Sequence, residues 1–419
     1  MMKKLPADRI YLLMALSAGV VYKVTFAMSA IYRVQVVNLD VFQLVMLGTV
    51  LEVSVFLFEV PTGVVADVYS RRLSVIIGIA MMGVGFMLEG LIPAYLTVLL
   101  AQVIWGIGWT FLSGAQSAWI TDEVGVEQAS KLFLSGRQVL QVGSLVGIAI
   151  AVPLANISLQ LPYYIGGGLY LLLAVLLILF MDETGFKPRP KEEREGWRDM
   201  VTTMRGGINV MRSRTALVWF ALIALFVGLY SEGWDRLKEP QLLENHSFPD
   251  LFGLSLGPVE WFAILSVAAN LLVIAASQFA RSRMNTVSTH TLARALQVMY
   301  AVMVASMIGF ALSGQFWAAI GFMLLFDTLR TITYPLSEAF VNHYVDSKVR
   351  ATVLSMTGQI DAFGQMSGGP VIGTIGRLFS MPAAILAAAG ILFPTVPLFG
   401  VLLRKDSSTD ETQEAITAP

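Results

Sequence analysis

Four carboxylic acids lie inside strongly apolar segments of the chain, at Glu52, Glu232, Asp327 and Asp361. Ionisable side chains in such segments are costly and usually functional. A carboxyl group with no water nearby favours its neutral form, which suits a group that takes up and releases a proton. We therefore interpret all four as candidate proton-coupling residues. Glu52 and Asp361 are the first choice, because each lies near the middle of its segment and they fall in opposite halves of the chain.

Other side chains in the apolar segments suit the wall of a substrate cavity. We expect that wall to include Lys23, Arg137, Gln138, Arg330, Trp105 and Trp109. Aromatic surfaces suit large apolar ligands, although Trp is also enriched in belts at both faces of a membrane. Lys23 is a possible partner for the proton-carrying acid, and its alternative is to extend its ammonium group to the membrane surface.

Spacing predicts two ion pairs within single helices. Asp327 and Arg330 are three residues apart, and Glu232 and Arg236 are four apart in the favourable order. The first pair would be either functional or purely structural. Asp235 and Arg236 would mark the edge of the membrane, because they lie near the end of their apolar segment.

The composition shows what must position these residues. The chain has 419 residues, of which 56% are hydrophobic and 14% charged, and its mean hydropathy is +0.70. A soluble chain would carry about a quarter charged residues. Residues 90–121, 138–181 and 378–403 contain no Asp, Glu, Lys or Arg at all. Since apolar stretches of this length are candidate membrane helices, the sequence predicts an integral membrane protein.

Charged and Pro/Gly-rich turns divide the chain into twelve predicted spans. They are residues 9–31, 41–65, 73–92, 95–121, 131–154, 161–181, 215–236, 257–280, 289–312, 315–342, 349–376 and 380–403. The predicted fold is an all-α membrane protein with two pseudo-symmetric bundles of six helices. The bundles would comprise residues 1–181 and 215–404, joined by a charged linker at 182–214 and followed by a disordered tail at 405–419.

Basic residues predict the orientation of the spans. Most lysines and arginines fall at the N-terminus, in the linker and in the loops on the same side. The opposite side has only Arg33, Arg236, Lys238 and Arg377. Positive loops stay in the cytoplasm, so both termini and the linker are predicted to be cytoplasmic and the protein to reside in the cell membrane.

Several function classes are excluded or disfavoured. There are no cysteines, only three scattered histidines and no G-x-x-x-x-G-K-[ST] loop, so we expect no metal, no cofactor and no ATP hydrolysis. A net charge of −1 gives no sign of nucleic-acid binding. A polytopic membrane enzyme is the alternative from another class, but no histidine has an acid or serine at a recognisable catalytic spacing.

The segment "EVPTGVVADVYSRR" at residues 59–72 resembles the loop signature of the major facilitator superfamily. The signature residues Gly63, Asp67, Arg71 and Arg72 are present, whereas Val68 and Ser70 replace the usual Arg and Gly. The segments after the fourth and tenth spans also echo each other, as expected of a duplicated transporter. Gln102, four residues before Gly106, stands where the family often has Arg.

The resemblance implies a conformational latch at this loop. Gly63 would let two helices approach closely, and Asp67 would face a helix N-terminus in the other half, near Arg350. Arg71 and Arg72 would pair with Asp122 and Glu123, which end the fourth span on the same side. Two arginines in a cytoplasmic loop also follow from the positive-inside rule alone.

The resemblance implies a secondary active transporter that works by alternating access. We expect a monomer in the lipid bilayer that exports a small amphipathic molecule in exchange for protons. The alternative is proton-coupled uptake of a small metabolite.

Overall fold

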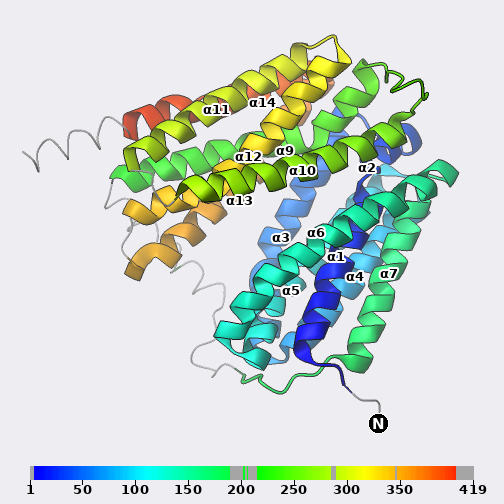
Figure 1. Ribbon diagram of the computed structural model, residues 1–419, viewed down its shortest axis with the longest axis vertical. Coiled ribbons are helices and arrows are strands. Elements are labelled where there is room, and N and C mark those ends of the chain that lie inside the picture. Colours follow the sequence, from blue (N-terminus) through cyan, green and yellow to red (C-terminus); the bar gives the residue numbers. More distant parts are fainter. Residues whose placement is uncertain are drawn as a thin grey trace, which may run out of the picture. The chain divides into compact units, whose positions relative to one another are not determined.

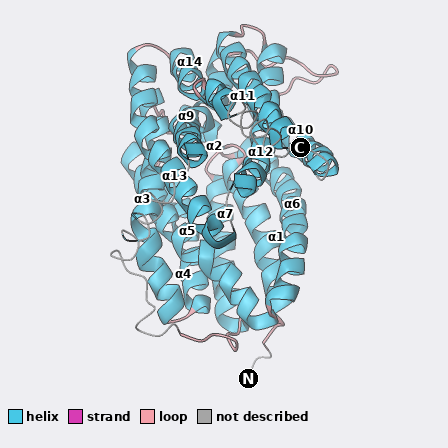
Figure 2. Ribbon diagram, turned by 90° about the vertical axis from the view of Figure 1, so that its left-hand side faces the viewer, coloured by secondary structure: helices cyan, strands magenta, loops and turns pink. Residues whose placement is uncertain are grey.

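The computed structural model describes residues 4–188, 202, 205, 215–284, 289–344 and 347–402, without the side chains of 215–216, 279–289 and 341–352. Over these ranges the regular structure is helical, apart from one isolated bridge between Leu251 and Leu254 (Figures 1 and 2). The predicted all-α fold is confirmed. Most of the predicted linker and the whole of the predicted tail at 405–419 lie outside the described residues.

The chain forms two compact units. The first contains the described parts of residues 1–43, 50–200 and 250–267, and the second those of 44–49, 201–249 and 268–419. The helices of the N-terminal half are α1 (Ala7–Phe26), α2 (Ser29–Ile31), the π-helix η1 (Tyr32–Val36), α3 (Val41–Val68), α4 (Arg71–Leu91), α5 (Tyr95–Val124), α6 (Val126–Ile157) and α7 (Leu161–Phe180). Those of the C-terminal half are α9 (Thr215–Asn245), α10 (Pro258–Met284), α11 (Thr289–Leu312), α12 (Phe316–Tyr344), α13 (Ser347–Leu378) and α14 (Met381–Leu392).

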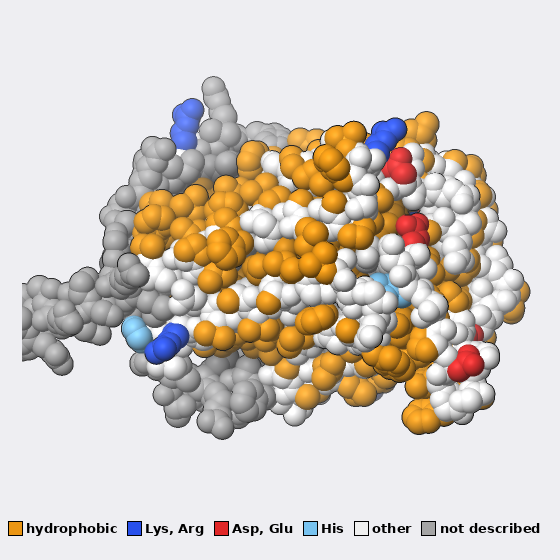
Figure 3. Space-filling view, turned by 90° about the horizontal axis from the view of Figure 1, so that it is seen from above, with side chains coloured by type: hydrophobic (Ala, Val, Ile, Leu, Met, Phe, Trp, Pro, Cys, Tyr) orange, Lys and Arg blue, Asp and Glu red, His pale blue; other side chains and the backbone are white. Residues whose placement is uncertain are grey.

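Eleven helical segments of the described chain are long and apolar enough to cross a membrane. The one predicted span that is not among them, residues 349–376, corresponds to α13, which has the length but carries Gln359, Asp361 and Gln365 in its middle. Large apolar side chains remain exposed on the helices, as Leu172, Val175 and Leu179 do on one face of α7. Figure 3 shows a face on which hydrophobic side chains predominate and charges are few. Such a surface suits contact with lipid.

Polar side chains fix where several helices begin. Asp40 caps α3 by accepting from the Gln43 backbone N–H at 2.8 Å, and the Gln43 side chain accepts from the Asp40 N–H at 3.0 Å. Ser70 caps α4 in the same way, through the Leu73 N–H at 2.9 Å. Each cap satisfies donors that the helix itself leaves without a partner.

Two helix pairs pack with their backbones in contact. In the first unit, a Cβ added at Gly143 of α6 would lie 2.5 Å from the Leu16 carbonyl oxygen of α1. In the second unit, a Cβ added at Gly364 of α13 would lie 2.6 Å from the Leu225 carbonyl oxygen of α9. Small residues permit this close approach, which gives dispersion contact without any hydrophobic drive from water. Much of the glycine pattern of α13 therefore serves helix packing.

A buried ion pair joins three helices of the first unit. The Arg33 Nε of η1 donates to Glu89 Oε1 of α4 at 2.9 Å, and Arg33 Nη2 lies 2.8 Å from the same oxygen. Gln102 of α5 donates from Nε2 to the other carboxylate oxygen at 2.9 Å. Tyr32 donates to the Glu89 backbone carbonyl at 2.6 Å. The Glu89 side chain is 1% exposed, so its charge is balanced inside the protein and not by water.

The close contact between α1 and α6 predicts the effect of adding one methyl group. Gly143→Ala places its Cβ against backbone atoms that cannot give way, so we expect a loss of about 1–3 kcal/mol in stability despite the better helix propensity of Ala. Gly168 of α7 is the matched control, because a Cβ there meets no described atom within 4 Å. Thermal unfolding of the purified variants should show a lower midpoint for Gly143→Ala only; equal midpoints would contradict the packing argument.

A double-mutant cycle can test the coupling between Arg33 and Glu89. Arg33→Met leaves a buried carboxylate without its cation, and Glu89→Leu leaves a buried guanidinium, so each should cost about 3–5 kcal/mol. The double variant removes both charges and should be much less destabilised than the sum of the two. Additive losses in thermal or denaturant unfolding would mean that the two charges do not interact.

Candidate functional site

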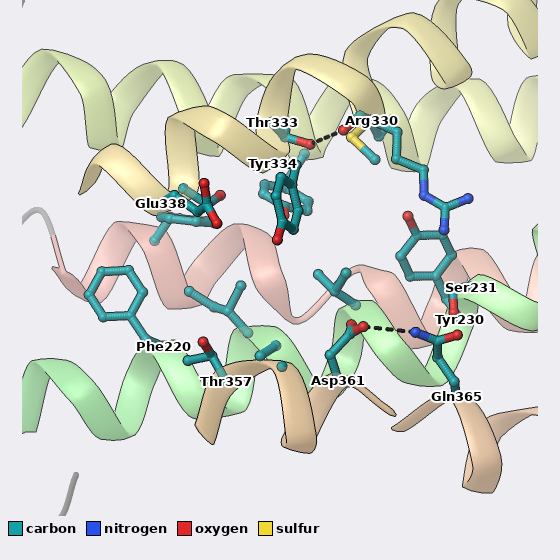
Figure 4. Close-up of a pocket in the computed structure, with 18 of the residues that line it drawn as sticks. Phe220, Tyr230, Ser231, Arg330, Thr333, Tyr334, Glu338, Thr357, Asp361 and Gln365 are labelled. Carbon is teal, nitrogen blue, oxygen red and sulfur yellow. Dashed lines mark hydrogen bonds between the residues drawn. The ribbon is translucent and has the colours of Figure 1, made fainter. Parts of the chain in front are cut away.

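The second unit contains a pocket of about 350 Å³ between α9, α11, α12 and α13. Nineteen residues line it, and Figure 4 shows eighteen of them as sticks. Its walls are largely apolar and aromatic, with Phe220, Tyr300 and Phe399 among them. Concave pockets of this size and character are where small ligands bind. We refer to it as the α9–α13 pocket.

Asp361, Glu338 and Arg330 are the charged side chains that line the α9–α13 pocket. Asp361 accepts a hydrogen bond from Gln365 Nε2 one turn along α13, at 2.8 Å (Figure 4). Arg330 extends from α12, and its guanidinium carbon lies 5.6 Å from the centre of the Tyr230 ring. The pocket thus brings together the predicted proton carrier Asp361 and the predicted cavity residue Arg330.

The predicted pair between Asp327 and Arg330 is wrong, because both residues pair with α9 instead. Arg330 donates to both carboxylate oxygens of Asp235, at 2.5 and 2.9 Å. Asp327 accepts from Lys238 Nζ at 2.7 Å and from Trp234 Nε1 at 2.8 Å. Asp327 and Arg330 each have an oppositely charged partner on α9. These ion pairs between helices form in place of the predicted pair within α12.

These pairs change the interpretation of Asp235. The sequence placed it at the membrane edge, but its bidentate contact with Arg330 makes it a structural partner of a pocket residue. The predicted pair between Glu232 and Arg236 is confirmed, with Arg236 Nε 3.1 Å from the Glu232 carboxylate. Its acid is buried and its cation is partly buried.

The cavity candidates of the first unit are dispersed. Arg137 and Gln138 are exposed on α6, and Trp109 is 48% exposed on α5. Trp105 stacks on Phe26 with ring centres 4.9 Å apart, so its indole contributes to the aromatic core. Lys23 and Glu52 are partly buried on α1 and α3. Their roles in a substrate cavity or in proton coupling stay predictions.

The turn between α3 and α4 holds a charged cluster. Arg71 forms the predicted ion pair with Asp122 and donates to the Ala118 carbonyl at 3.0 Å. The predicted pair of Arg72 with Glu123 is wrong. The Arg72 backbone N–H donates to Glu183 at 2.9 Å, and its side chain donates to the Ile178 carbonyl at 2.7 Å.

The segment after α7 explains why Glu123 is not available to Arg72. The Glu123 carboxylate accepts from the backbone N–H groups of Thr184 and Gly185, at 2.6 and 2.8 Å, and from the Thr184 hydroxyl. These donors satisfy it where the chain leaves α7. The cluster of Arg71, Asp122, Glu123 and Glu183 therefore lies within the first unit.

Two further features of the predicted latch concern its glycine and its acid. A Cβ added at Gly63 would meet no described atom within 4 Å, and the role of this glycine in the latch stays a prediction. Asp67 is the second-last residue of α3, which ends at Val68. The side chain of Arg350, its predicted neighbour, lies outside the described residues.

Sequence reasoning missed three polar groups that the structure makes prominent. Glu89 follows an apolar run and precedes a Gly-Leu-Ile-Pro turn, so it was not counted among the buried charges. Glu338 stands one residue after Ser337 near the end of a span, where a carboxylate attracts little notice. The Tyr230 hydroxyl is buried without a hydrogen-bond partner in the described protein, which only tertiary structure can reveal.

Comparisons with known proteins agree with this architecture. The model of the Major Facilitator Superfamily matches residues 10–361. The MFS-type transporter YxaM of Bacillus subtilis (strain 168) is 21% identical over 370 residues, which cover 87% of this chain and 88% of that relative.

Solved structures share the fold at low identity. A variant of the nucleoside transporter NupG gives a TM-score of 0.76 at 13% identity, covering 94% of this chain and 99% of that chain. A bacterial homologue of the human lysosomal transporter Spinster, inward-facing and unoccupied, gives 0.73 at 14% identity, with 95% and 96% covered. A POT family transporter in complex with a thioalcohol-conjugated peptide gives 0.73 at 13%, with 96% of each chain covered. The family match over most of the chain, joined to the shared helical fold, shows that the protein belongs to the major facilitator superfamily and is a membrane transporter, not an enzyme.

Proposed function

We propose that the protein exports a small amphipathic molecule across the cell membrane in exchange for protons, as a monomer with both termini in the cytoplasm. The observation that carries the proposal is the α9–α13 pocket, whose apolar and aromatic wall holds an acid in mid-span. An apolar body would contact the aromatic wall, and a polar group would contact Asp361. The distribution of Lys and Arg supports the orientation.

Asp361 is the coupling residue in this proposal. Its helix packs against α9 at the level of the acid itself, because a Cβ at Gly228 would overlap the Asp361 carbonyl oxygen. The carboxyl group is thereby held in the pocket wall, with an uncharged amide as its hydrogen-bonding neighbour. Protonation there removes a negative charge from the pocket and so changes its affinity for a ligand. Glu52, Glu232 and Asp327 are the remaining candidates, and the last two already have cationic partners.

The test begins with a substrate. Cells that lack their own exporters are screened against toxic amphipathic compounds with and without this gene, and a compound to which the gene gives resistance is then followed in proteoliposomes. Resistance indicates export, whereas sensitisation would favour the alternative, proton-coupled uptake. A flux that does not change when a pH gradient is imposed would contradict proton coupling.

Asp361→Asn should abolish accumulation driven by a pH gradient, whereas downhill exchange of the same compound should remain measurable at saturating concentration, because exchange does not require the proton. Asp361→Glu should restore part of the coupled flux. Glu127→Gln is the matched control, since this acid of α6 has a side chain 89% exposed and lies outside the pocket. If coupled flux persists in Asp361→Asn, the same measurement on Glu52→Gln decides whether that acid carries the proton.

We propose that Asp67 governs the conformational cycle together with the charged cluster at the α3–α4 turn. Asp67→Asn should lower turnover at least tenfold while the purified yield and the midpoint of thermal unfolding stay unchanged. Asp122→Asn, which removes the partner of Arg71, should lower the unfolding midpoint as well, because that ion pair joins α4 to α5. Normal flux in Asp67→Asn would rule out its conformational role.

A further inference from the structure

We propose that the α9–α13 pocket selects organic cations, namely amphipathic molecules with a protonated amine and an aromatic or apolar body. The inference rests on the proposed function and names the substrate class of the same pocket. Three observations carry it: the balance of charge in the pocket, a buried hydroxyl with no partner, and the aromatic wall.

The balance of charge leaves the pocket acidic. Arg330 is its cation, and Asp235 already neutralises it through two hydrogen bonds at 2.5 and 2.9 Å. Asp361 and Glu338 line the same space, and neither has a salt bridge within the described part of the chain. A carboxylate held away from bulk water is strongly stabilised by a cation at contact distance. A cationic ligand supplies that charge.

The neighbouring ion pairs leave no spare cation on α9. Lys238 is engaged by Asp327 at 2.7 Å, and Arg236 is engaged by Glu232 at 3.1 Å. An anionic ligand would therefore meet two carboxylates and an arginine whose charge Asp235 already balances. A neutral ligand would leave the charge of the acids uncompensated. The described charges thus favour a cation over either alternative.

Tyr230 provides the second observation. Its side chain is 0% exposed, lines the pocket, and its hydroxyl has no hydrogen-bond partner in the described protein. Figure 4 shows Tyr230 and Asp361 on α9 and α13 with their oxygens directed into the space below α12. A buried hydroxyl without a partner costs free energy, which a ligand can recover. An ammonium group can donate to both the Tyr230 hydroxyl oxygen and the Asp361 carboxylate.

The aromatic wall suits the body of such a ligand. Figure 4 shows Phe220 at the end of the pocket away from Arg330. Phe399 also lines the pocket, and Tyr300 stacks on it with ring centres 5.3 Å apart. Aromatic faces attract cations and accept apolar rings. The polar end, with Asp361 and Tyr230, and the aromatic end together match an amine attached to a ring.

Three soluble probes of similar size separate charge from shape: 2-phenylethylamine, which is protonated at pH 7, neutral 2-phenylethanol and anionic 3-phenylpropionate. Isothermal titration of the purified full-length protein should show the amine binding at least tenfold more tightly than the alcohol, and the carboxylate more weakly than both. Asp361→Asn should weaken the amine at least tenfold and leave the alcohol within about twofold. Glu338→Gln should weaken the amine by a smaller factor.

Tyr230→Phe removes the hydroxyl alone and should weaken the amine while preserving the fold. Glu127→Gln should bind all three probes as the unchanged protein does. The inference is overturned if the alcohol or the carboxylate binds as tightly as the amine, if no amine binding is measurable, or if Asp361→Asn leaves amine binding unchanged.

A variant that fills the pocket distinguishes failure of this inference from failure of the proposed function. Thr357→Trp places an indole in the pocket and should abolish flux of the compound found by the resistance screen. Loss of flux together with preference for the neutral or anionic probe would overturn the cation inference and leave the pocket as the transport site. Unchanged flux would remove the pocket from the proposed function altogether.

Discussion

The scarcity of water inside the membrane is the constraint on which the rest of the structure depends. A charge buried there must meet another charge or face a cavity, because the cost of leaving it alone is several kcal/mol. The described chain answers with pairs between helices: Arg33 with Glu89, Arg330 with Asp235, and Lys238 with Asp327. Each pair consumes a cation. The carboxylates of the α9–α13 pocket have no such partner in the described chain. They therefore determine which ligands the second unit can bind.

Helix packing follows from the same constraint. Lipid tails are as apolar as leucine side chains, so burying apolar side chains between helices gives little free energy of association. Close van der Waals contact between the helices must supply that free energy instead. Gly143 against Leu16 and Gly364 against Leu225 show the result in both units. In the second unit this contact has a chemical consequence. The backbone of α13 is held against α9 around Asp361, so the orientation of the acid is fixed by backbone packing and not by a long flexible side chain.

Much of the fold could be predicted from the sequence, because a span is a local property of 20 or so residues and its hydropathy. The pair of Glu232 with Arg236 was also local, and the i, i+4 spacing sufficed. Asp327 and Arg330 were not predictable in this way, since their partners are set by how α12 packs against α9. Glu89 was missed for a different reason. It stands next to a turn, and only the folded chain brings Arg33 of η1 and Gln102 of α5 to its carboxylate.

The two units use charge in opposite ways, and the contrast supports placing ligand chemistry in the second. In the first, the Glu89 carboxylate meets Arg33 and Gln102 in a site 1% exposed, so the charge is balanced and water is excluded. Such a cluster holds helices together and offers no net charge to a ligand. In the second, Asp361 and Glu338 face a pocket of about 350 Å³ while the nearby cation is occupied. One pocket thus contains the unbalanced negative charge, the Tyr230 hydroxyl without a described hydrogen-bond partner and the aromatic wall. This pocket is large enough for a small molecule.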